Sequence, residues 1–291
     1  MQQLSPDALV GATLGEYRLE HLLAKGELSS MYLATNPKAN TPFTLRILHV
    51  NADQSTASGA AYVERFQQQA SHIATLQHPY ILPLVDFNVW RGVPYLVWPG
   101  VSARALTSRL GQNVPLDVLT IGRYLDQITA ALEYAHEHAT LHRNLTTDCI
   151  YIQRDGQLLV SDFGLRRMIE LGRQDAQWYA LYDLGEACAP EQLLGQHANT
   201  FTDVYGLGGV LYRLLTGRPV FTGDTREDVA HLHLHAPIPP LSSWRGGLPN
   251  GLDAVIASAL AKEPDQRETH PGAIANAYHQ IVTPNNPARV P

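Results

Sequence analysis

Charged side chains are scarce in this sequence of 291 residues, because only 16% of them are Asp, Glu, Lys or Arg. A typical soluble domain carries about 25%. The formal net charge at pH 7 is −6. Proteins that bind nucleic acid or anionic membranes do so through clustered Lys and Arg side chains. The composition therefore argues against both kinds of partner.

Cysteine and long apolar runs are also scarce. Cys149 and Cys188 are the two cysteines, too few for a disulfide framework or a cysteine-rich zinc site. No stretch approaches the 18 or so consecutive apolar residues that a membrane span needs. Residues 1–6 lack the basic region and apolar core of a signal peptide. These absences predict a cytoplasmic protein with no membrane span.

The sequence does contain enough apolar residues for a core, with 45% of them hydrophobic. Up to residue 101 the pattern is mostly strand-like, with one helical segment at 60–76. The expected strands are 17–23, 30–34, 43–50, 84–90 and 95–98. From residue 102 the pattern is mainly helical, with helices expected at 116–138, 203–216 and 252–261 and a hairpin at 150–160. A strand-rich part followed by a helical part predicts an α+β fold with two lobes.

Five short motifs follow one another in the second part of the chain. They are His-Arg-Asn-Leu-Thr-Thr-Asp-Cys at 142–149, Asp-Phe-Gly at 162–164, Ala-Pro-Glu at 189–191, Asp-Val-Tyr-Gly-Leu-Gly at 203–208 and Pro-Asp-Gln-Arg at 264–267. In this order and at this spacing, the sequence resembles a eukaryotic-like Ser/Thr protein kinase domain of the bacterial type. The resemblance extends over residues 17–282.

The resemblance implies a bilobal protein-kinase-like fold, with a small β-rich N-lobe that has one main helix and a larger helical C-lobe. The implied division is a lead-in at 1–16, an N-lobe at 17–98, a hinge at 99–102, a C-lobe at 103–282 and a flexible tail at 283–291.

The implied catalytic loop, 142–149, departs from the family pattern at three positions. Asn144 stands where the family has the Asp that accepts the proton of the substrate hydroxyl, and an amide cannot take that proton. Thr146 replaces the Lys that faces the transferred phosphate. Cys149 replaces the metal-binding Asn, and a thiol is a soft ligand that suits Mg²⁺ poorly. We therefore expect no intact set of catalytic residues.

The implied nucleotide site has lost its ion pair. Arg46 stands where the family has the ATP-binding Lys, and the helix residue that should pair with it is Gln69 instead of Glu. Asp162 is the one retained metal ligand, and two interpretations of it are open. It could hold a cation, or it could pair with Arg46 in an empty site. We favour the pair, because an unpaired buried carboxylate is costly.

The glycine-rich phosphate loop would begin at Leu23, and only Gly26 remains of its three expected glycines. An ordinary hairpin turn around Gly26 is the favoured alternative. The remaining vestigial nucleotide-binding positions, several of them large side chains that we interpret as core, are Met31, Thr44, Trp98, Val101 and Tyr151. Binding of MgATP is therefore left open but is not expected.

The structural anchors of the family persist. By the resemblance, Glu191 pairs with Arg267, and Asp203 fixes the backbone around His142 and Arg143. The activation segment, 165–188, has no Ser or Thr, so we expect no Ser/Thr phosphorylation there.

Two further histidine motifs are interpreted without a chemical role. The run His231-Leu-His233-Leu-His235 could be a metal-binding stripe if it were a strand. We favour solvated side chains on a surface helix. The motif around His136 is interpreted as the polar end of a helix.

Two functions follow. The favoured one is a catalytically inactive pseudokinase that regulates or scaffolds through an unidentified protein partner in signalling. The alternative is a weak or atypical ATP-dependent Ser/Thr protein kinase that relies on Asp162 and Arg46.

Overall fold

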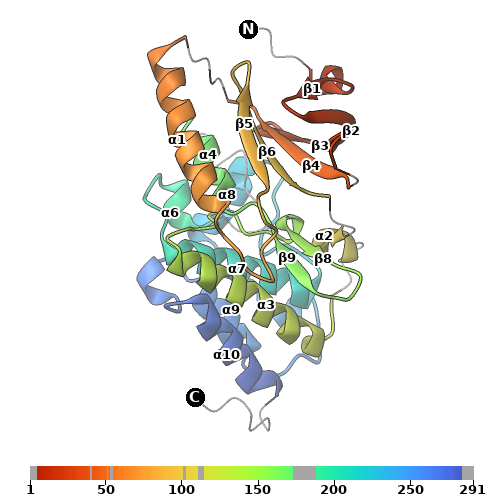
Figure 1. The fold of residues 1–291 in the computed structure, drawn as a ribbon. Coiled ribbons are helices and arrows are strands. Elements are labelled where there is room, and N and C mark those ends of the chain that lie inside the picture. Colours follow the sequence, from red (N-terminus) through yellow and green to blue (C-terminus); the bar gives the residue numbers. More distant parts are fainter. Residues whose placement is uncertain are drawn as a thin grey trace. The chain divides into compact units, whose positions relative to one another are not determined.

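The computed structural model describes residues 5–39, 41–50, 52, 55–100, 103–110, 115–172 and 188–283 (Figure 1). The chain divides into two compact units. Unit 1 comprises Met1–Ser102 together with Asp162–Ala176, and unit 2 comprises Ala103–Ser161 together with Gln177–Pro291. The stretch that begins at Asp162 thus joins the strand-rich unit, although it follows much of unit 2 in the sequence.

Unit 1 contains a six-stranded antiparallel sheet with the strand order β1-β2-β3-β4-β6-β5 (Figure 1). Its strands are β1 (Thr13–Leu14), β2 (Tyr17–Lys25), β3 (Ser29–Thr35), β4 (Phe43–Leu48), β5 (Asp86–Trp90) and β6 (Val93–Pro99). Tyr32, Leu45 and Val97 are directly opposite one another on neighbouring strands and are fully buried. Because side chains alternate along a strand, Met31, Arg46 and Leu96 lie on the other face.

Helix α1 (Ala57–Ile73) starts at Thr56, whose Oγ1 accepts a hydrogen bond from the backbone N–H of Gly59 at 3.1 Å. Its apolar residues follow the helical period that the sequence predicts, and Tyr62 and Phe66 are buried. The helix is offset from the predicted segment and ends at Ile73.

A short helix, α4 (Leu165–Glu170), packs against α1 within unit 1. Its Met168 and Ile169 side chains are buried. Gly164, which precedes α4, has a φ of 65°, and a Cβ there would come within 2.5 Å of the Ile73 side chain. Glycine therefore permits both the left-handed turn and the close approach to α1.

The expectation that residues 1–16 are only a lead-in is incomplete. A 3₁₀ turn, η1 (Pro6–Leu9), is held by a hydrogen bond from Tyr32 Oη to the carbonyl of Pro6 at 2.9 Å. Strand β1 then pairs with β2, and Leu14 is fully buried in the core of unit 1. A two-residue strand carries no period that a sequence pattern could reveal.

Unit 2 is mainly helical. Its helices are α2 (Leu106–Arg109), α3 (Val118–Glu137), α6 (Pro190–Leu193), α7 (Thr200–Thr216), α8 (Arg226–His235), α9 (Leu252–Ala259) and α10 (Pro271–Val282), with 3₁₀ turns η3 (Thr147–Cys149), η4 (Leu241–Ser243) and η5 (Pro264–Gln266). A small sheet has the order β7-β8-β9, made of β7 (Arg104–Ala105), β8 (Ile150–Ile152) and β9 (Leu158–Val160).

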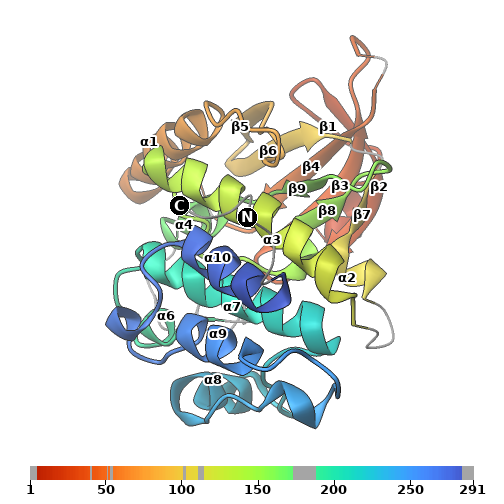
Figure 2. The ribbon, with the colours of Figure 1, turned by 90° about the horizontal axis from the view of Figure 1, so that it is seen from below.

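Helix α7 is the core helix of unit 2 and packs against α3, α9 and α10 (Figure 2). Nearly all of its side chains are buried. A Cβ at Gly208 would lie 2.8 Å from the Cβ of Ala259, so glycine lets α7 and α9 approach closely. The helices predicted at 116–138, 203–216 and 252–261 agree with α3, α7 and α9 to within a few residues.

Among the described residues, no helix combines the length and the apolar character that crossing a membrane requires. The expected tail lies outside the described residues beyond Thr283.

Candidate functional site

An ion pair lies on the face of the unit 1 sheet that also carries Met31 and Leu96. Arg46 Nη2 donates to Asp162 Oδ2 at 2.9 Å, and the two side chains are 18% and 16% exposed. The same nitrogen lies 3.9 Å from Met31 Sδ, on the neighbouring strand. The Nε atom of Arg46 is buried and has no hydrogen-bond partner among the described residues. The expected Arg46–Asp162 pair is therefore present.

Gln69 lies nearby on α1 but does not take over the role of the missing Glu. No hydrogen bond joins Gln69 to Arg46 in the part of the chain that the structure describes. A Cβ at Gly164 would lie 3.4 Å from Gln69 Nε2, so the amide faces the start of α4. The cation of Arg46 is thus neutralised by Asp162, and α1 contributes no charge to it.

The segment around Gly26 is an ordinary turn between β2 and β3. Its backbone N–H donates to the carbonyl of Ser29 at 2.9 Å, and the flanking residues Lys25 and Ser30 are paired. Gly26 does not have the positive φ that only glycine adopts readily. Leu23, at the expected start of a phosphate loop, is 51% exposed. This geometry favours the hairpin interpretation.

The expected adenine-binding positions are only partly core. Trp98 is buried at 6% exposure and lies opposite Thr44 in the sheet. Met31 and Tyr151 are half-buried rather than core, which corrects the interpretation of both as core residues. Tyr151 belongs to β8 of unit 2, and Val101 lies outside the described residues.

The loop at 142–149 of unit 2, which the resemblance implies to be the catalytic loop, is held by the buried carboxylate of Asp203. Its Oδ2 accepts from the backbone N–H of His142 at 2.8 Å, and its Oδ1 accepts from that of Arg143 at 2.6 Å. Arg143 has a φ of 68°, a left-handed conformation that costs a non-glycine residue roughly 1–2 kcal/mol. The anchor expected at Asp203 is therefore confirmed, and it holds a strained loop.

Two contacts of this loop were not expected from the sequence. Nε2 of His136 lies 2.7 Å from Asp203 Oδ2, so the end of α3 shares the same carboxylate. Gln192 Nε2 donates to the carbonyl of Arg143 at 2.8 Å. A histidine at a helix end and a glutamine next to Ala-Pro-Glu carry no signal by themselves, because both contacts connect residues far apart in the sequence.

Cys149 is 4% exposed and makes hydrogen bonds within its own turn. Its Sγ donates to the carbonyl of Thr146 at 3.0 Å and accepts from the backbone N–H of Thr146 at 3.2 Å. The Nε2 atom of His142 is 3.6 Å away and is 2.9 Å from the carbonyl of Ser161. The thiol thus helps to fold the loop.

The two other changed positions of the loop, Thr146 and Asn144, are also at least partly buried. Thr146 is 7% exposed and its Oγ1 lies 3.7 Å from Cys149 Sγ, so this hydroxyl is turned into the loop. Asn144 is half-buried, and its backbone carbonyl lies 3.8 Å from the same sulfur. Neither side chain supplies the positive or negative charge that phosphoryl transfer requires at these positions.

The donors at the expected metal positions do not fit a Mg²⁺ ion. Mg²⁺ requires oxygen ligands in a nearly octahedral arrangement. Asp162 is bound to Arg46, and Cys149 offers a thiol that is engaged with backbone groups. Within the described residues, no group of three or more His, Cys, Asp or Glu side chains is arranged to hold a metal ion.

The expected pair of Glu191 and Arg267 is confirmed as a buried anchor. Two hydrogen bonds of 2.8 Å join the guanidinium to the two carboxylate oxygens. Burial disfavours the charged carboxylate, but the hydrogen bonds and the charge of Arg267 outweigh it, so the pKa of Glu191 lies below its usual value. Thr202 Oγ1 adds a further hydrogen bond at 2.8 Å.

The interpretation of the histidine run as solvated is wrong for His233. The run forms the end of α8, where His233 is fully buried and its Nδ1 lies 2.9 Å from Tyr205 Oη. The ring of Phe221 packs edge-on against it. Burial, reinforced by the charge of Lys262, lowers the pKa of His233 to about 4. His231 and His235 are exposed, as expected.

The sequence matches the family model described as "Protein kinase domain" over residues 17–279. It is 32% identical over 260 residues to the serine/threonine-protein kinase PknB of Mycobacterium tuberculosis, covering 86% of this chain and 40% of the relative. It is 28% identical over 283 residues to the serine/threonine-protein kinase PknH of Mycobacterium bovis, covering 95% of this chain and 46% of the relative. The chain thus spans less than half the length of these relatives.

The fold is similar to that of a solved structure, Rad53 1–466 in complex with AMP-PNP. The TM-score is 0.70 at 20% sequence identity, over 90% of this chain and 64% of the other. The α+β architecture of a strand-rich unit and a helical unit agrees with this fold. With its five motifs in order and the family match over most of its length, the chain belongs to the protein kinase domain family, with bacterial Ser/Thr protein kinases among its relatives.

Proposed function

We propose that this chain is a catalytically inactive protein kinase domain that regulates or scaffolds other proteins through protein–protein contacts. The observation that carries the proposal is the ion pair between Arg46 and Asp162. The cation that the family directs at the nucleotide phosphates and the carboxylate that it directs at the metal neutralise each other here. Neither charge remains available for MgATP without breaking the pair.

The loop at 142–149, in unit 2, supports the same conclusion. Asn144 cannot act as a general base, whose contribution in enzymes is typically about 10²–10⁴-fold in rate. Cys149 is committed to its own turn. In contrast, Asp203, Glu191 and Arg267 keep the contacts that shape unit 2. A domain that keeps its fold and loses its charged chemistry is suited to binding other proteins.

Nucleotide binding and phosphoryl transfer test the proposal directly. The full chain is heated with millimolar ATP, with and without Mg²⁺, and in parallel is incubated with labelled ATP and a general protein substrate. We expect no Mg²⁺-dependent rise in melting temperature and no transfer of label.

Asp162→Asn is the informative variant for this test, and Asp265→Asn, an exposed Asp in a 3₁₀ turn, is its matched control. Transfer of label by the wild type that disappears in Asp162→Asn and persists in Asp265→Asn would overturn the proposal in favour of a weak Ser/Thr protein kinase. A rise in melting temperature without transfer of label would agree with a catalytically inactive domain and would identify the nucleotide as its ligand.

A further inference from the structure

The histidine run at the end of α8 is divided by the helical period. In a strand, alternate residues share a face, but in a helix the residues four apart do so. His233 therefore points into the core of unit 2, whereas His231 and His235 are both exposed. Their ring centroids are 4.8 Å apart, with the planes tilted by 57°. The two imidazoles form a neighbouring pair on one surface.

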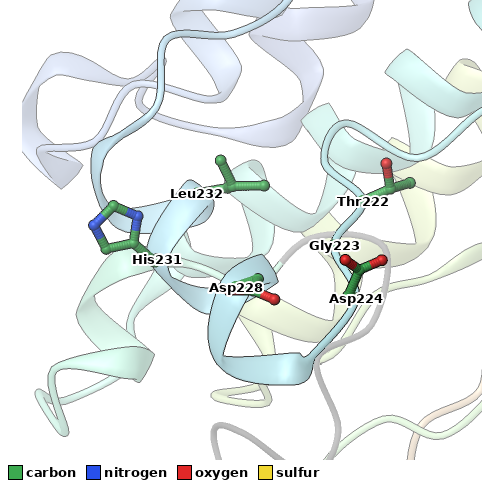
Figure 3. A pocket seen from close by; sticks show the side chains of 6 residues that line it. All are labelled: Thr222, Gly223, Asp224, Asp228, His231 and Leu232. Atoms are coloured by element: carbon green, nitrogen blue, oxygen red, sulfur yellow. The ribbon is translucent and has the colours of Figure 1, made fainter.

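The groups around this pair supply no third metal ligand within the described residues, so the candidate site consists of the two histidines. A shallow hollow at the start of α8 is lined by His231 together with Asp224 and Asp228 (Figure 3). Figure 3 shows His231 and the carboxylate of Asp224 at opposite ends of the hollow. Asp228 is used by the helix itself, because its Oδ2 accepts from the backbone N–H of Thr225 at 3.0 Å. A third protein ligand is absent from the described residues.

The backbone carbonyls near the end of α8 already accept hydrogen bonds. Lys262 Nζ donates to the carbonyls of His233 at 2.7 Å and Leu232 at 3.3 Å. These carbonyls are therefore not free to bind a cation, and the lysine charge opposes one nearby. The imidazole rings must supply the binding energy, which predicts a modest and exchangeable affinity.

We infer that His231 and His235 form a bidentate surface site for a divalent transition-metal ion of the Zn²⁺, Cu²⁺ or Ni²⁺ class. Imidazole nitrogen is a favoured ligand of these ions and a poor one for Mg²⁺ or Ca²⁺. Two histidines four residues apart on a helix present both rings to one ion, at metal–nitrogen distances of about 2.0–2.1 Å for Zn²⁺. The rings already lie side by side, so little freedom is lost on binding. Water completes the coordination.

A metal titration of the full, untagged chain tests this site. Zn²⁺ is titrated against a competing coloured chelator for the wild type and for His231→Ala and His235→Ala. Each substitution leaves one ligand, so we expect it to weaken binding at this site by roughly a hundredfold through loss of the second, intramolecular contact. His197→Ala, which removes an exposed histidine elsewhere in unit 2, should change nothing.

A spectroscopic measurement distinguishes chelation by both rings from an unspecific effect of removing any one histidine. With Cu²⁺ as the probe, electron paramagnetic resonance should show coupling to two nitrogens in the wild type and in His197→Ala, and to one nitrogen in His231→Ala and His235→Ala. Equal Zn²⁺ affinity in the wild type and both variants, or the same nitrogen coupling in all of them, would overturn the inference. Circular dichroism checks that the variants keep the helix content of the wild type, which we expect because both side chains are exposed.

Discussion

Two arginine–carboxylate pairs of this chain differ in how completely they are satisfied. In unit 2 the side chains of Arg267 and Glu191 are 0% and 3% exposed. The guanidinium also donates to three backbone carbonyls, those of Phe201, Ala261 and Lys262. In unit 1, Arg46 reaches Asp162 through one nitrogen, and within the part of the chain that the structure describes its Nε has no partner.

The difference indicates what each pair does. A fully hydrogen-bonded, buried pair fixes several backbone segments at once, so it stabilises only the arrangement in which it formed. A single contact between partly exposed groups mainly cancels two opposite charges. The charge of Arg267 therefore stabilises the fold of unit 2, whereas the charge of Arg46 neutralises that of Asp162.

The largest expected effect is on the buried pair. Arg267→Met should lower the free energy of unfolding by about 3–5 kcal/mol, because the substitution leaves the carboxylate of Glu191 buried without its cation. Urea unfolding followed by circular dichroism measures it. A loss no greater than that of Arg46→Met would break the comparison between the two pairs.

A buried neutral histidine gives the next largest effect. The pKa of His233 is about 4 in the folded chain and about 6.5 when unfolded. Between these values the unfolded chain binds the proton and the folded chain does not, so stability falls as the pH is lowered from about 6.5 toward 4. The loss should reach about 3 kcal/mol.

Urea unfolding at several pH values across this window measures that loss. The variant His233→Gln should show a correspondingly shallower dependence on pH, since the titrating group is gone. Equal slopes for the wild type and the variant would show that the proton enters elsewhere.

The pair in unit 1 should respond more weakly. Asp162→Asn is expected to lower the free energy of unfolding by about 1 kcal/mol, because the amide can still accept from Arg46 and both side chains keep some contact with water. The same urea experiment checks it. A cost equal to that of Arg267→Met would mean that Arg46–Asp162 is also an architectural anchor.

The smallest effect on stability is expected for an exposed ion pair. Lys38 bonds to Glu16 at the surface of unit 1, with both side chains more than half exposed. Removal of the cation in Lys38→Ala should leave the urea midpoint of unfolding essentially unchanged, because solvent screens this exposed pair. A clear drop in that midpoint would show that exposure alone does not order these pairs.

The sequence predicted those parts of the site that depend on residue order and charge. The resemblance to the kinase family implied that Asp203, Glu191 and Arg267 are anchors, and the cost of an unpaired buried carboxylate favoured a pair between Asp162 and Arg46. These predictions succeed because a buried charge is costly unless it is paired or hydrogen-bonded, and each of these groups has such a partner.

Other features of the fold and of the site depend on the three-dimensional structure and could not be predicted from the sequence. The run from His231 to His235 alternates in the sequence, and only the helical geometry of α8 reveals that its middle member is core. Strand β1 is too short to have a period. The hydrogen bond of His136 to Asp203 joins residues 67 positions apart, and nothing local to His136 indicates it. Long-range polar contacts are set by packing, which a single sequence does not record.

The carboxylate of Asp203 has a consequence for hydrogen exchange. It is buried, and it accepts the backbone N–H groups of His142 and Arg143, two residues outside any helix or strand. Amide protons in such loops usually exchange quickly with solvent deuterium, because little has to open first. Here the two protons can exchange only when the start of α7 moves away. They should therefore be as slow as the amides in the middle of α7, and so report from a loop on the opening of the helical core.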